Sequence, residues 1–414
     1  MAKTLNVYLH RDLVGYLTQD QGGQMFFTYA ESWLRNPLAH PISHSLPLRT
    51  ERFKSKECRG YFAGVLPEES NREIIARNLG ISARNDYAML ERIGGECAGA
   101  VTFIPAGEAL PERDDHYREL SPSELANVLR LLPRRPLLAG ESGIRLSLAG
   151  AQNKIAVRVD GDKVSLTLGG APSTHILKPA VERFAGLVHN EAFCMKLADE
   201  IDLPSAKTEI RWVEDVEYLL VERYDRTITL NGDGVPHFER IHQEDFCQAL
   251  GIVSEMKYQK EGGPSLKQCF ELMRRVSSAP VIDIARLLDA VFFNYLIGNN
   301  DAHGKNFSLL YRPSESAQYE VRLAPLYDVV STCYYPELTG EMAMRIGKTY
   351  HCERVTKADF EQLAEEAGLS KPLLRKRLHG VAEAILAKMS ERPIEHPVES
   401  ALAELIRKRC QINW

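Results

Sequence analysis

Two oxygen-bearing side chains separated by four residues are the first feature of this sequence that could do chemistry. Asp301 and Asn306 lie in "GNNDAHGKN", residues 298–306, which also contains His303 and Lys305. A carboxylate can accept the proton of a hydroxyl group, and an amide oxygen can help to hold a metal ion. The same side chains could merely cap turns, and the spacing alone does not separate the two roles.

A further carboxylate lies at the end of an expected β-hairpin. "NFSLLY" (306–311) has the composition of a strand, and "YEVRLAPLYD" (319–328) that of a returning strand that leads to Asp328. Mg²⁺ prefers a few hard oxygen ligands together with phosphate oxygens. We therefore expect Asn306 and Asp328 to share a Mg²⁺ ion.

An apolar helix is predicted immediately before the polar segment, over residues 283–297. Its expected buried face follows the 3.6-residue period and consists of Ile284, Leu287, Leu288, Val291, Phe292, Tyr295 and Leu296. Gly298 would end the helix. A buried helix is a rigid base for functional side chains, which favours a chemical role for the residues that follow it.

A second candidate segment is a loop of mostly small residues in the β-rich half of the chain. Strands are predicted over 144–148, 155–159, 163–168 and 174–178. The loop between the first two consists of Ala149, Gly150, Ala151, Gln152, Asn153 and Lys154. Small residues let backbone N–H groups approach phosphate oxygens, although the segment matches no Walker motif and could be an ordinary turn.

Lys178 lies at the end of the strand 174–178, about where a Lys could reach the phosphates of a nucleotide. Glu191, on the helix predicted next, is a candidate ion-pair partner for it. The alternative for Lys178 is a solvated strand end, which is the usual environment of Lys.

The segment "LLVERYDR" (219–226) joins the β-rich block to a mainly helical block. Glu222, Arg223 and Tyr224 lie where the backbone of a protein kinase pairs with adenine. The complete order is loop, Lys, Glu, connecting segment, Asp-x-x-x-x-Asn and metal-binding Asp. Protein kinases have the same order, and chance rarely produces it.

The bulk properties are those of a globular protein with several domains. The chain has 414 residues, of which 44% are hydrophobic and 26% charged, and its net charge of −5 gives no general argument for nucleic-acid binding. Eight Cys without a Cys-x-x-Cys pair indicate reduced, mostly buried thiols. Pro41 disfavours a zinc site made by His40 and His44. The start lacks the apolar core of a signal peptide and the apolar runs are too short to span a bilayer, so we expect a cytoplasmic protein without a membrane partner.

Several segments together resemble HipA, the kinase toxin of bacterial toxin–antitoxin pairs. They are "IRLSLAGAQNKIAV", "THILKPA", "HNEAFCMKLA", "YLLVERYDR", "GNNDAHGKNFSLL" and "LAPLYDVVST", with "LPLRT" and "YFAGVLPE" nearer the N-terminus. The resemblance covers most of the chain. It implies an α+β, bilobal protein-kinase-like fold with a β-rich N-terminal lobe, which includes a small N-terminal subdomain, and an all-α C-terminal lobe. The expected domains are 1–105, 106–224 and 225–414.

The resemblance also implies roles for individual residues in an ATP- and Mg²⁺-dependent serine/threonine protein kinase. Asp301 would be the catalytic base, Asn306 and Asp328 the Mg²⁺ ligands, and Ser147 a site of inactivating autophosphorylation. The residues implied at the nucleotide are the loop 149–154, Lys178, the connecting residues 222–224, His303 and Lys305, with Glu191 supporting Lys178. Asn153 departs from the family, in which an acid is usual, and this puts the strength of nucleotide binding in doubt.

The implied partners are a HipB-like helix-turn-helix antitoxin, operator DNA reached through that antitoxin, and a protein substrate. The substrate would be an aminoacyl-tRNA synthetase, with the glutamyl enzyme as the first hypothesis, so that phosphorylation would block translation and growth. Three alternatives stay open: a catalytically weak corepressor that acts with its antitoxin, a metal-dependent hydrolase that uses Asp301, His303 and Asp328, and a kinase of small molecules. ATP turnover and the identity of the labelled product would separate them.

Overall fold

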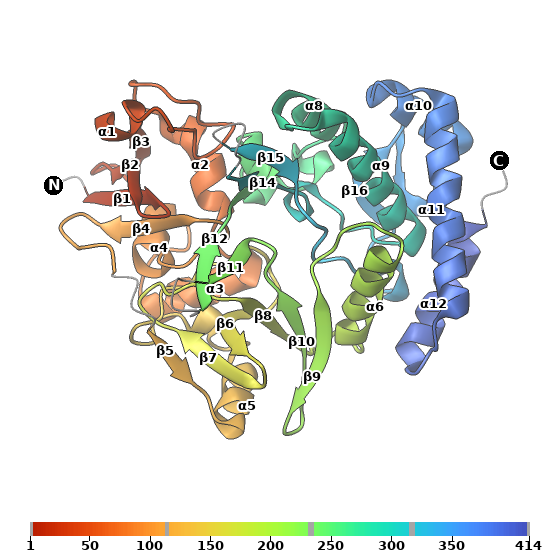
Figure 1. Cartoon of the computed structure of the whole chain (residues 1–414), viewed down its shortest axis with the longest axis horizontal. Coiled ribbons are helices and arrows are strands. Elements are labelled where there is room, and N and C mark those ends of the chain that lie inside the picture. Colours follow the sequence, from red (N-terminus) through yellow and green to blue (C-terminus); the bar gives the residue numbers. More distant parts are fainter. Residues whose placement is uncertain (1–2, 112–115, 231–235, 314–318, 412–414) are drawn as a thin grey trace. The chain divides into compact units, whose positions relative to one another are not determined.

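The computed structural model describes residues 3–111, 116–230, 236–313 and 319–411. The chain forms two compact units (Figure 1). The first unit comprises Met1–Pro179, Arg211–Glu255 and Leu310–Tyr319, and the second comprises Ala180–Ile210, Met256–Leu309 and Glu320–Trp414. The first is rich in β-strands and the second is mainly helical.

A four-stranded antiparallel sheet lies in the N-terminal part of the first unit. Its strand order is β3–β2–β1–β4, with β1 at Lys3–Leu9, β2 at Asp12–Gln19, β3 at Met25–Tyr29 and β4 at Val101–Pro105. Alternate residues of β1 are buried, as the alternating sequence predicts. The helices of this region are α1 (Glu31–Leu34), α2 (Ser55–Gly64), α3 (Glu69–Leu79) and α4 (Asp86–Ile93).

A six-stranded sheet has the order β5–β7–β6–β8–β10–β9. The strands are β5 (Tyr117–Glu119), β6 (Ile155–Asp160), β7 (Lys163–Thr167), β8 (His175–Pro179), β9 (Thr208–Val213) and β10 (Val216–Glu222). The predicted hairpin is confirmed, because Asp160 pairs with Lys163 across its turn. The expected start of α5 (Pro122–Leu131) is also confirmed, with Ser121 and Glu124 forming a capping box.

The strand predicted over residues 144–148 is wrong. Leu146 forms only an isolated bridge with Glu96. The Glu96 N–H donates to Arg145 O at 2.7 Å, and the Ser147 N–H donates to Glu96 O at 2.8 Å. This segment is extended because it bonds to the chain around Glu96, and it does not join the ladder of a sheet.

The rest of the first unit contains β11 (Arg226–Leu230), β12 (Pro236–Arg240), β13 (His242–Asp245) and α7 (Phe246–Ala249). β11 and β12 form an antiparallel pair. One contiguous apolar core includes Val7 from the four-stranded sheet, Phe62 from α2 and Leu177 from β8. The N-terminal region and the six-stranded sheet therefore share their hydrophobic core.

The second unit contains α6 (Leu187–Glu200), α8 (Leu266–Val276), α9 (Pro280–Ile297), α10 (Lys357–Glu366), α11 (Lys371–Glu391) and α12 (Pro397–Cys410). α9 packs against α8, α11 and α12 (Figure 1). The expectation of one buried face on α9 is incomplete. Ala290, Phe293, Asn294 and Ile297 are also buried, because neighbouring helices surround α9, whereas Tyr295 of the predicted face is only half-buried.

The expectation of an all-α C-terminal lobe needs correction, although the α+β class holds. Strands β14 (Ser308–Arg312), β15 (Glu320–Leu323), β16 (Glu341–Ile346) and β17 (Thr349–His351) follow α9. The predicted hairpin after residue 306 is confirmed, since β14 and β15 are neighbours in one sheet. β16 and β17 form where Ile346 pairs with Thr349 across a tight turn that contains Gly347, at φ +58°.

The cysteines are free thiols, and all of them are buried except Cys333, which is half-buried. This confirms the prediction of mostly buried thiols. Among the described residues, none of the helices has the length and apolar character that crossing a membrane requires.

A buried carboxylate in the first unit should make the stability of the folded protein depend on pH. Glu244 in β13 is 1% exposed. It accepts hydrogen bonds from Ser43 Oγ at 2.5 Å, from the His44 N–H at 3.0 Å and from the Tyr311 hydroxyl. Burial raises the pKa of Glu244 to about 7, and these hydrogen bonds offset part of that increase.

The wild-type protein should lose stability as pH rises, because of Glu244, and we expect that Glu244→Gln does not show this loss. The folded protein keeps its proton on Glu244 while the unfolded chain ionises, so the wild-type protein loses stability as pH rises from about 4.5 to about 7. The loss should be on the order of 2–3 kcal/mol. Urea unfolding of both proteins at several pH values measures it. Parallel pH dependences for the two proteins would contradict the prediction.

Candidate functional site

The predicted polar segment begins where α9 ends. Gly298 ends the helix in the left-handed conformation, at φ +76°. A Cβ atom at this position would lie 2.8 Å from Cys333 Cβ, so the backbone conformation and the close approach both require glycine. The Asn299 N–H then donates to Asn294 O at 2.8 Å, which completes the helix end.

A series of amide hydrogen bonds connects α9 to Asp301. Asn294 Nδ2 donates to Ala290 O at 2.8 Å, and Asn299 Nδ2 donates to Asn294 Oδ1 at 2.7 Å. The Asp301 N–H donates to Asn299 Oδ1 at 3.1 Å. These Asn side chains therefore support the loop, and this explains why so many of them occur beside a buried helix.

Asn300 connects the same loop to the segment that precedes β16. Its N–H donates to Thr332 Oγ1 at 2.8 Å, and its Nδ2 donates to Thr339 O at 3.3 Å. The Cys333 N–H donates to Gly298 O at 2.9 Å. The backbone around Asp301 is thus held by a second part of the unit as well as by α9.

Asp301 is exposed, and its carboxylate has a partner that the sequence did not reveal. The Tyr258 hydroxyl donates to Asp301 Oδ1 at 2.9 Å. The Tyr258 ring also meets the His303 ring edge-on, with the centroids 5.5 Å apart. No motif surrounds Tyr258, which lies 43 positions before Asp301. Only the tertiary structure brings Tyr258 to this carboxylate.

If the carboxylate of Asp301 is the base of the reaction, Tyr258→Phe should lower kcat several-fold and up to about tenfold. The substitution removes one solvent-exposed hydrogen bond, and a typical hydrogen bond of this kind contributes roughly 0.5–1.5 kcal/mol. Steady-state kinetics should show the effect on kcat with little change in the KM for ATP. An unchanged kcat would show that the Tyr258 hydroxyl does not position the carboxylate.

Asn306 and Asp328 meet in the second unit. Asn306 Nδ2 donates to Asp328 O at 3.3 Å, although the two residues are 22 positions apart. Asp328 adopts the left-handed conformation at φ +57°, which is costly for a residue with a Cβ atom and is common at functional sites. The Tyr327 hydroxyl lies 2.7 Å from Ser308 Oγ and donates to Lys305 O, which fixes the same turn.

The chemistry of this pair fits Mg²⁺. The amide N–H group of Asn306 is already occupied by a backbone carbonyl, so its Oδ1 is the end that can face a cation. The half-buried Asp328 carboxylate adds hard oxygen atoms. His303 and Lys305 belong to the same segment and are 7% and 6% exposed.

The loop 149–154 lies in the first unit, and a hydrogen bond between its last and first residues closes it. Lys154 Nζ donates to Ala149 O at 2.8 Å, so this Lys supports the loop. Gly150 has φ +102°, and a Cβ atom there would lie 2.6 Å from Lys154 Nζ. Asn153, the residue at which the sequence departs from the HipA pattern, has a buried Oδ1 without a hydrogen-bond partner within the described chain.

Lys178 lies on β8, between β6 and β10 in the six-stranded sheet, where it is paired with Leu219. It is 5% exposed, so the alternative of a solvated strand end is wrong. Glu191 lies on α6 in the second unit and is 1% exposed.

The residues that join the two sequence blocks have different environments. Glu222 ends β10 and is exposed, and the Tyr224 hydroxyl donates to Gln243 Oε1 at 2.6 Å. The Arg223 N–H donates to Thr174 O at 2.9 Å, and the Arg223 side chain is buried. The backbone amide and side chain of Arg223 therefore both serve the fold.

A buried ionic network surrounds Arg223. Its guanidinium group bonds to Glu96 Oε2 at 3.1 Å and to Asp225 Oδ2 at 2.8 Å, and Arg226 Nη2 bonds to Glu96 Oε1 at 2.7 Å. Burial alone would raise the pKa of Glu96, but Arg223 and Arg226 outweigh it and lower this pKa to about 2. The same two cations hold the pKa of Asp225 below its usual range against the effect of burial.

Ser147 is fully buried in the first unit, and its Oγ donates to Val65 O at 2.7 Å. The alternative of a surface serine is therefore wrong. A phosphoryl group could not occupy this position without breaking the hydrogen bond and moving the segment.

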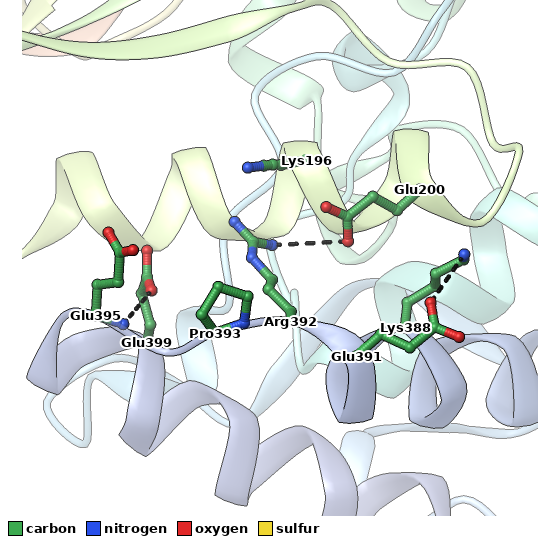
Figure 2. Close-up of a pocket in the computed structure, with 8 residues that line it drawn as sticks. All are labelled: Lys196, Glu200, Lys388, Glu391, Arg392, Pro393, Glu395 and Glu399. Carbon is green, nitrogen blue, oxygen red and sulfur yellow. Dashed lines mark hydrogen bonds and ion pairs between the residues drawn. The ribbon is translucent and has the colours of Figure 1, made fainter.

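The second unit contains a cavity of about 420 Å³ (Figure 2). Its lining includes none of the predicted site residues. Its walls come from α6, the end of α11, the connecting segment and α12. Figure 2 shows Arg392 beside Glu200 and Lys388 beside Glu391. The charged atoms lie 3.9 Å apart in the first pair and 3.2 Å apart in the second. Opposite charges within the lining thus pair with one another.

Comparisons with known proteins match both parts of the chain to one family. Residues 5–104 match the HipA N-terminal domain, and residues 146–389 match the HipA-like C-terminal domain. A Sinorhizobium fredii protein named "Putative kinase Y4mE" is 47% identical over 387 residues, which cover 92% of this chain and 90% of the relative. The serine/threonine-protein kinase toxin HipA of Shewanella oneidensis is 29% identical over 404 residues, 94% of this chain and 90% of the toxin.

A solved structure extends the match to the fold. It contains Shewanella oneidensis HipA with HipB and operator DNA, and its similar chain has 27% identity and a TM-score of 0.84. The alignment covers 98% of this chain and 96% of the other. The α+β, kinase-like fold expected from the sequence is confirmed. The chain belongs to the HipA family of serine/threonine kinase toxins.

Proposed function

We propose that this protein is an active serine/threonine protein kinase that transfers the γ-phosphoryl group of ATP to a protein hydroxyl. The observation that supports this most directly is the hydrogen bond between Asn306 and Asp328. Asn306 belongs to the loop that also presents the exposed Asp301. Membership of the HipA family supports the same reaction. Phosphoryl transfer requires mainly that the reactants are positioned and that phosphate charge is neutralised.

In this proposal, Asp301 accepts the proton of the substrate hydroxyl while Tyr258 and Asn299 hold it in place. The oxygen atoms of Asn306 and Asp328 would hold Mg²⁺, which when bound neutralises phosphate charge. Lys178 would bind the ATP phosphates, with Glu191 as its supporting partner. His303 and Lys305 would lie near the nucleotide.

The remaining nucleotide contacts would come from backbone groups. The loop 149–154 would bind phosphate oxygens through its N–H groups. Glu222, Arg223 and Tyr224 would meet adenine through those backbone groups that the fold leaves available, since the Arg223 side chain is committed to Glu96 and Asp225.

Autophosphorylation at Ser147 would inactivate the kinase. Phosphorylation adds about 1.5 to 2 negative charges at neutral pH. That charge would face the carbonyl oxygen of Val65, which now accepts the Ser147 hydroxyl proton, and it would lie close to a loop that must bind other phosphates. The phosphorylated segment should therefore leave its buried position and lose affinity for ATP.

The protein substrate in this proposal is an aminoacyl-tRNA synthetase, with the glutamyl enzyme as the first candidate, and its modification would inhibit translation. A HipB-like antitoxin would bind the chain and connect it to operator DNA. The Shewanella oneidensis relative was solved with HipB and its operator DNA, which supports such a partner.

The decisive experiment incubates the purified chain with Mg²⁺ and ATP labelled at the γ-position, alone and with a bacterial lysate. Label on protein, with a phosphate on Ser147 found by mass spectrometry, is the expected result. Release of labelled phosphate without labelled protein would favour a hydrolase instead. Binding to a HipB-like protein without any turnover of ATP would favour the corepressor, and a labelled metabolite would favour a small-molecule kinase.

A further inference from the structure

Two groups of the N-terminal domain donate hydrogen bonds to carbonyl groups of the loop 149–154. The Glu68 N–H donates to Gly150 O at 3.4 Å, and Asn71 Nδ2 donates to Ala151 O at 2.8 Å. Both donors lie within the region that matches the HipA N-terminal domain, about 80 residues before the carbonyl groups that they bind. Residues 5–104 thus have a direct physical connection to a loop in the next domain.

The hydrogen bond from Asn71 is the shorter of the two, and its donor is a side-chain amide. It lies in the first turn of α3 and is 6% exposed, so both the helix and the surrounding packing fix its position. Removal of its amide group would leave Ala151 O without this donor. A substitution can therefore release the loop without any change to the loop sequence.

The hydrogen bonds to the loop determine the direction in which its amide groups point. The carbonyl groups of residues 149–151 each accept a hydrogen bond, from Lys154, Glu68 and Asn71 in turn. In a trans peptide the N–H group points opposite to the C=O group, and the described chain has no cis peptide bond.

Each N–H group of residues 150–152 is therefore turned away from the one donor that bonds the carbonyl group of the same peptide unit. The isolated parallel bridge between Pro67 and Gly150 directs the Gly150 amide toward Leu66 O, whereas within the described chain the amides of Ala151 and Gln152 donate no backbone hydrogen bond. These two successive backbone donors, turned away from Glu68 and Asn71, can bind phosphate oxygens.

We propose that Asn71 is a positioning residue, through which the N-terminal domain holds the loop in the conformation that binds ATP phosphates. This inference rests on the proposed kinase function for its ligand. It assigns that domain a role in nucleotide affinity, in addition to its share of the hydrophobic core. Asn71 acts through Ala151 and does not touch the nucleotide itself.

The first test measures how often the loop opens, without nucleotide and without activity. Lys154 is the last residue of the loop, and trypsin cleaves after Lys. Cleavage requires local opening, so its rate follows the population of the open loop. Asn71→Ala should increase the rate of cleavage after Lys154 about tenfold, as expected for a part-buried carbonyl that loses its donor.

The second test measures the affinity for a non-hydrolysable ATP analogue with Mg²⁺ by calorimetry. Asn71→Ala should weaken binding about tenfold, because the open loop does not present its amides. In the kinase assay the KM for ATP should rise while kcat changes little. Asn71→Asp, which keeps the size but loses the donor, should behave in the same way and serves if the Ala variant does not fold.

Asn78 provides a matched control on the same helix. It also lies in α3, and its Nδ2 donates to Arg134 O at 3.2 Å. Asn78→Ala removes the same chemical group from the same helix but leaves the loop contacts intact. Neither the tryptic cleavage of the loop nor the affinity for the analogue should change.

The results separate this inference from the proposed function. Wild-type protein that fails to bind the analogue would overturn the kinase proposal before any variant is compared. If wild-type protein binds it, unchanged cleavage in both Asn71 variants would overturn the inference. Faster cleavage with unchanged affinity would overturn it as well, because the contact would then serve only the fold.

Discussion

Asp301→Asn should reduce phosphoryl transfer by at least a hundredfold while nucleotide binding and folding stay intact. General-base catalysis typically contributes about 10²- to 10⁴-fold, and an amide cannot accept the proton. The side chain is exposed, and Asn retains an oxygen that can accept the hydrogen bond from Tyr258, so the fold should not suffer. Transfer from labelled ATP, calorimetry with an ATP analogue and thermal unfolding measure the three properties.

Asp199→Asn is a suitable control for this experiment. Asp199 is an exposed carboxylate on α6 in the same unit, and its substitution makes the same change of charge. Its kinase activity should equal that of the wild-type protein. An Asp301→Asn variant that folds normally and transfers phosphate at the wild-type rate would show that another group is the base.

The second large effect concerns stability. Arg223→Met should destabilise the folded protein by about 3–5 kcal/mol, because it leaves Glu96 and Asp225 buried with one cation fewer. Both carboxylates are almost fully buried, so water cannot replace the lost guanidinium group. Arg226 still contacts Glu96, which places the expected loss near the lower end of that range. Urea unfolding at neutral pH measures the effect.

Arg130→Met tests whether burial is the cause. Arg130 also bonds two carboxylates, Glu214 at 3.0 Å and Asp215, but its side chain is 43% exposed. Solvent screens such pairs, so the substitution should change stability little. Equal losses in the two variants would contradict the idea that burial makes the Arg223 network critical. An Arg223→Met variant of wild-type stability that binds ATP poorly would instead point to a nucleotide contact.

The sequence was informative about features that depend on residues a few positions apart. The capping box of Ser121 with Glu124 and the hairpin of β6 with β7 follow local rules, and the structure contains both. Gly298 was expected to end α9, and its left-handed conformation does so. The order of motifs also indicated a kinase-like fold, which the similarity to the Shewanella oneidensis protein confirmed.

Sequence reasoning failed where the environment of a residue depends on distant segments. Residues 144–148 have the alternation of a strand, yet their backbone bonds to Glu96. Lys178 and Ser147 could have been solvated, and both are buried. Alternation and residue type describe what a segment prefers, but they do not identify what covers it.

The sequence by itself determined the chemical groups, their order along the chain and the helix and strand signals next to them. Only the tertiary structure decided which groups meet: Tyr258 with Asp301, Asn306 with Asp328, and Asn71 with Ala151. Local signals arise from sterics and hydrogen bonds within a few residues, so they can be read from the sequence. Contacts between residues 22 to 80 positions apart depend on how the whole chain packs, which no local pattern encodes.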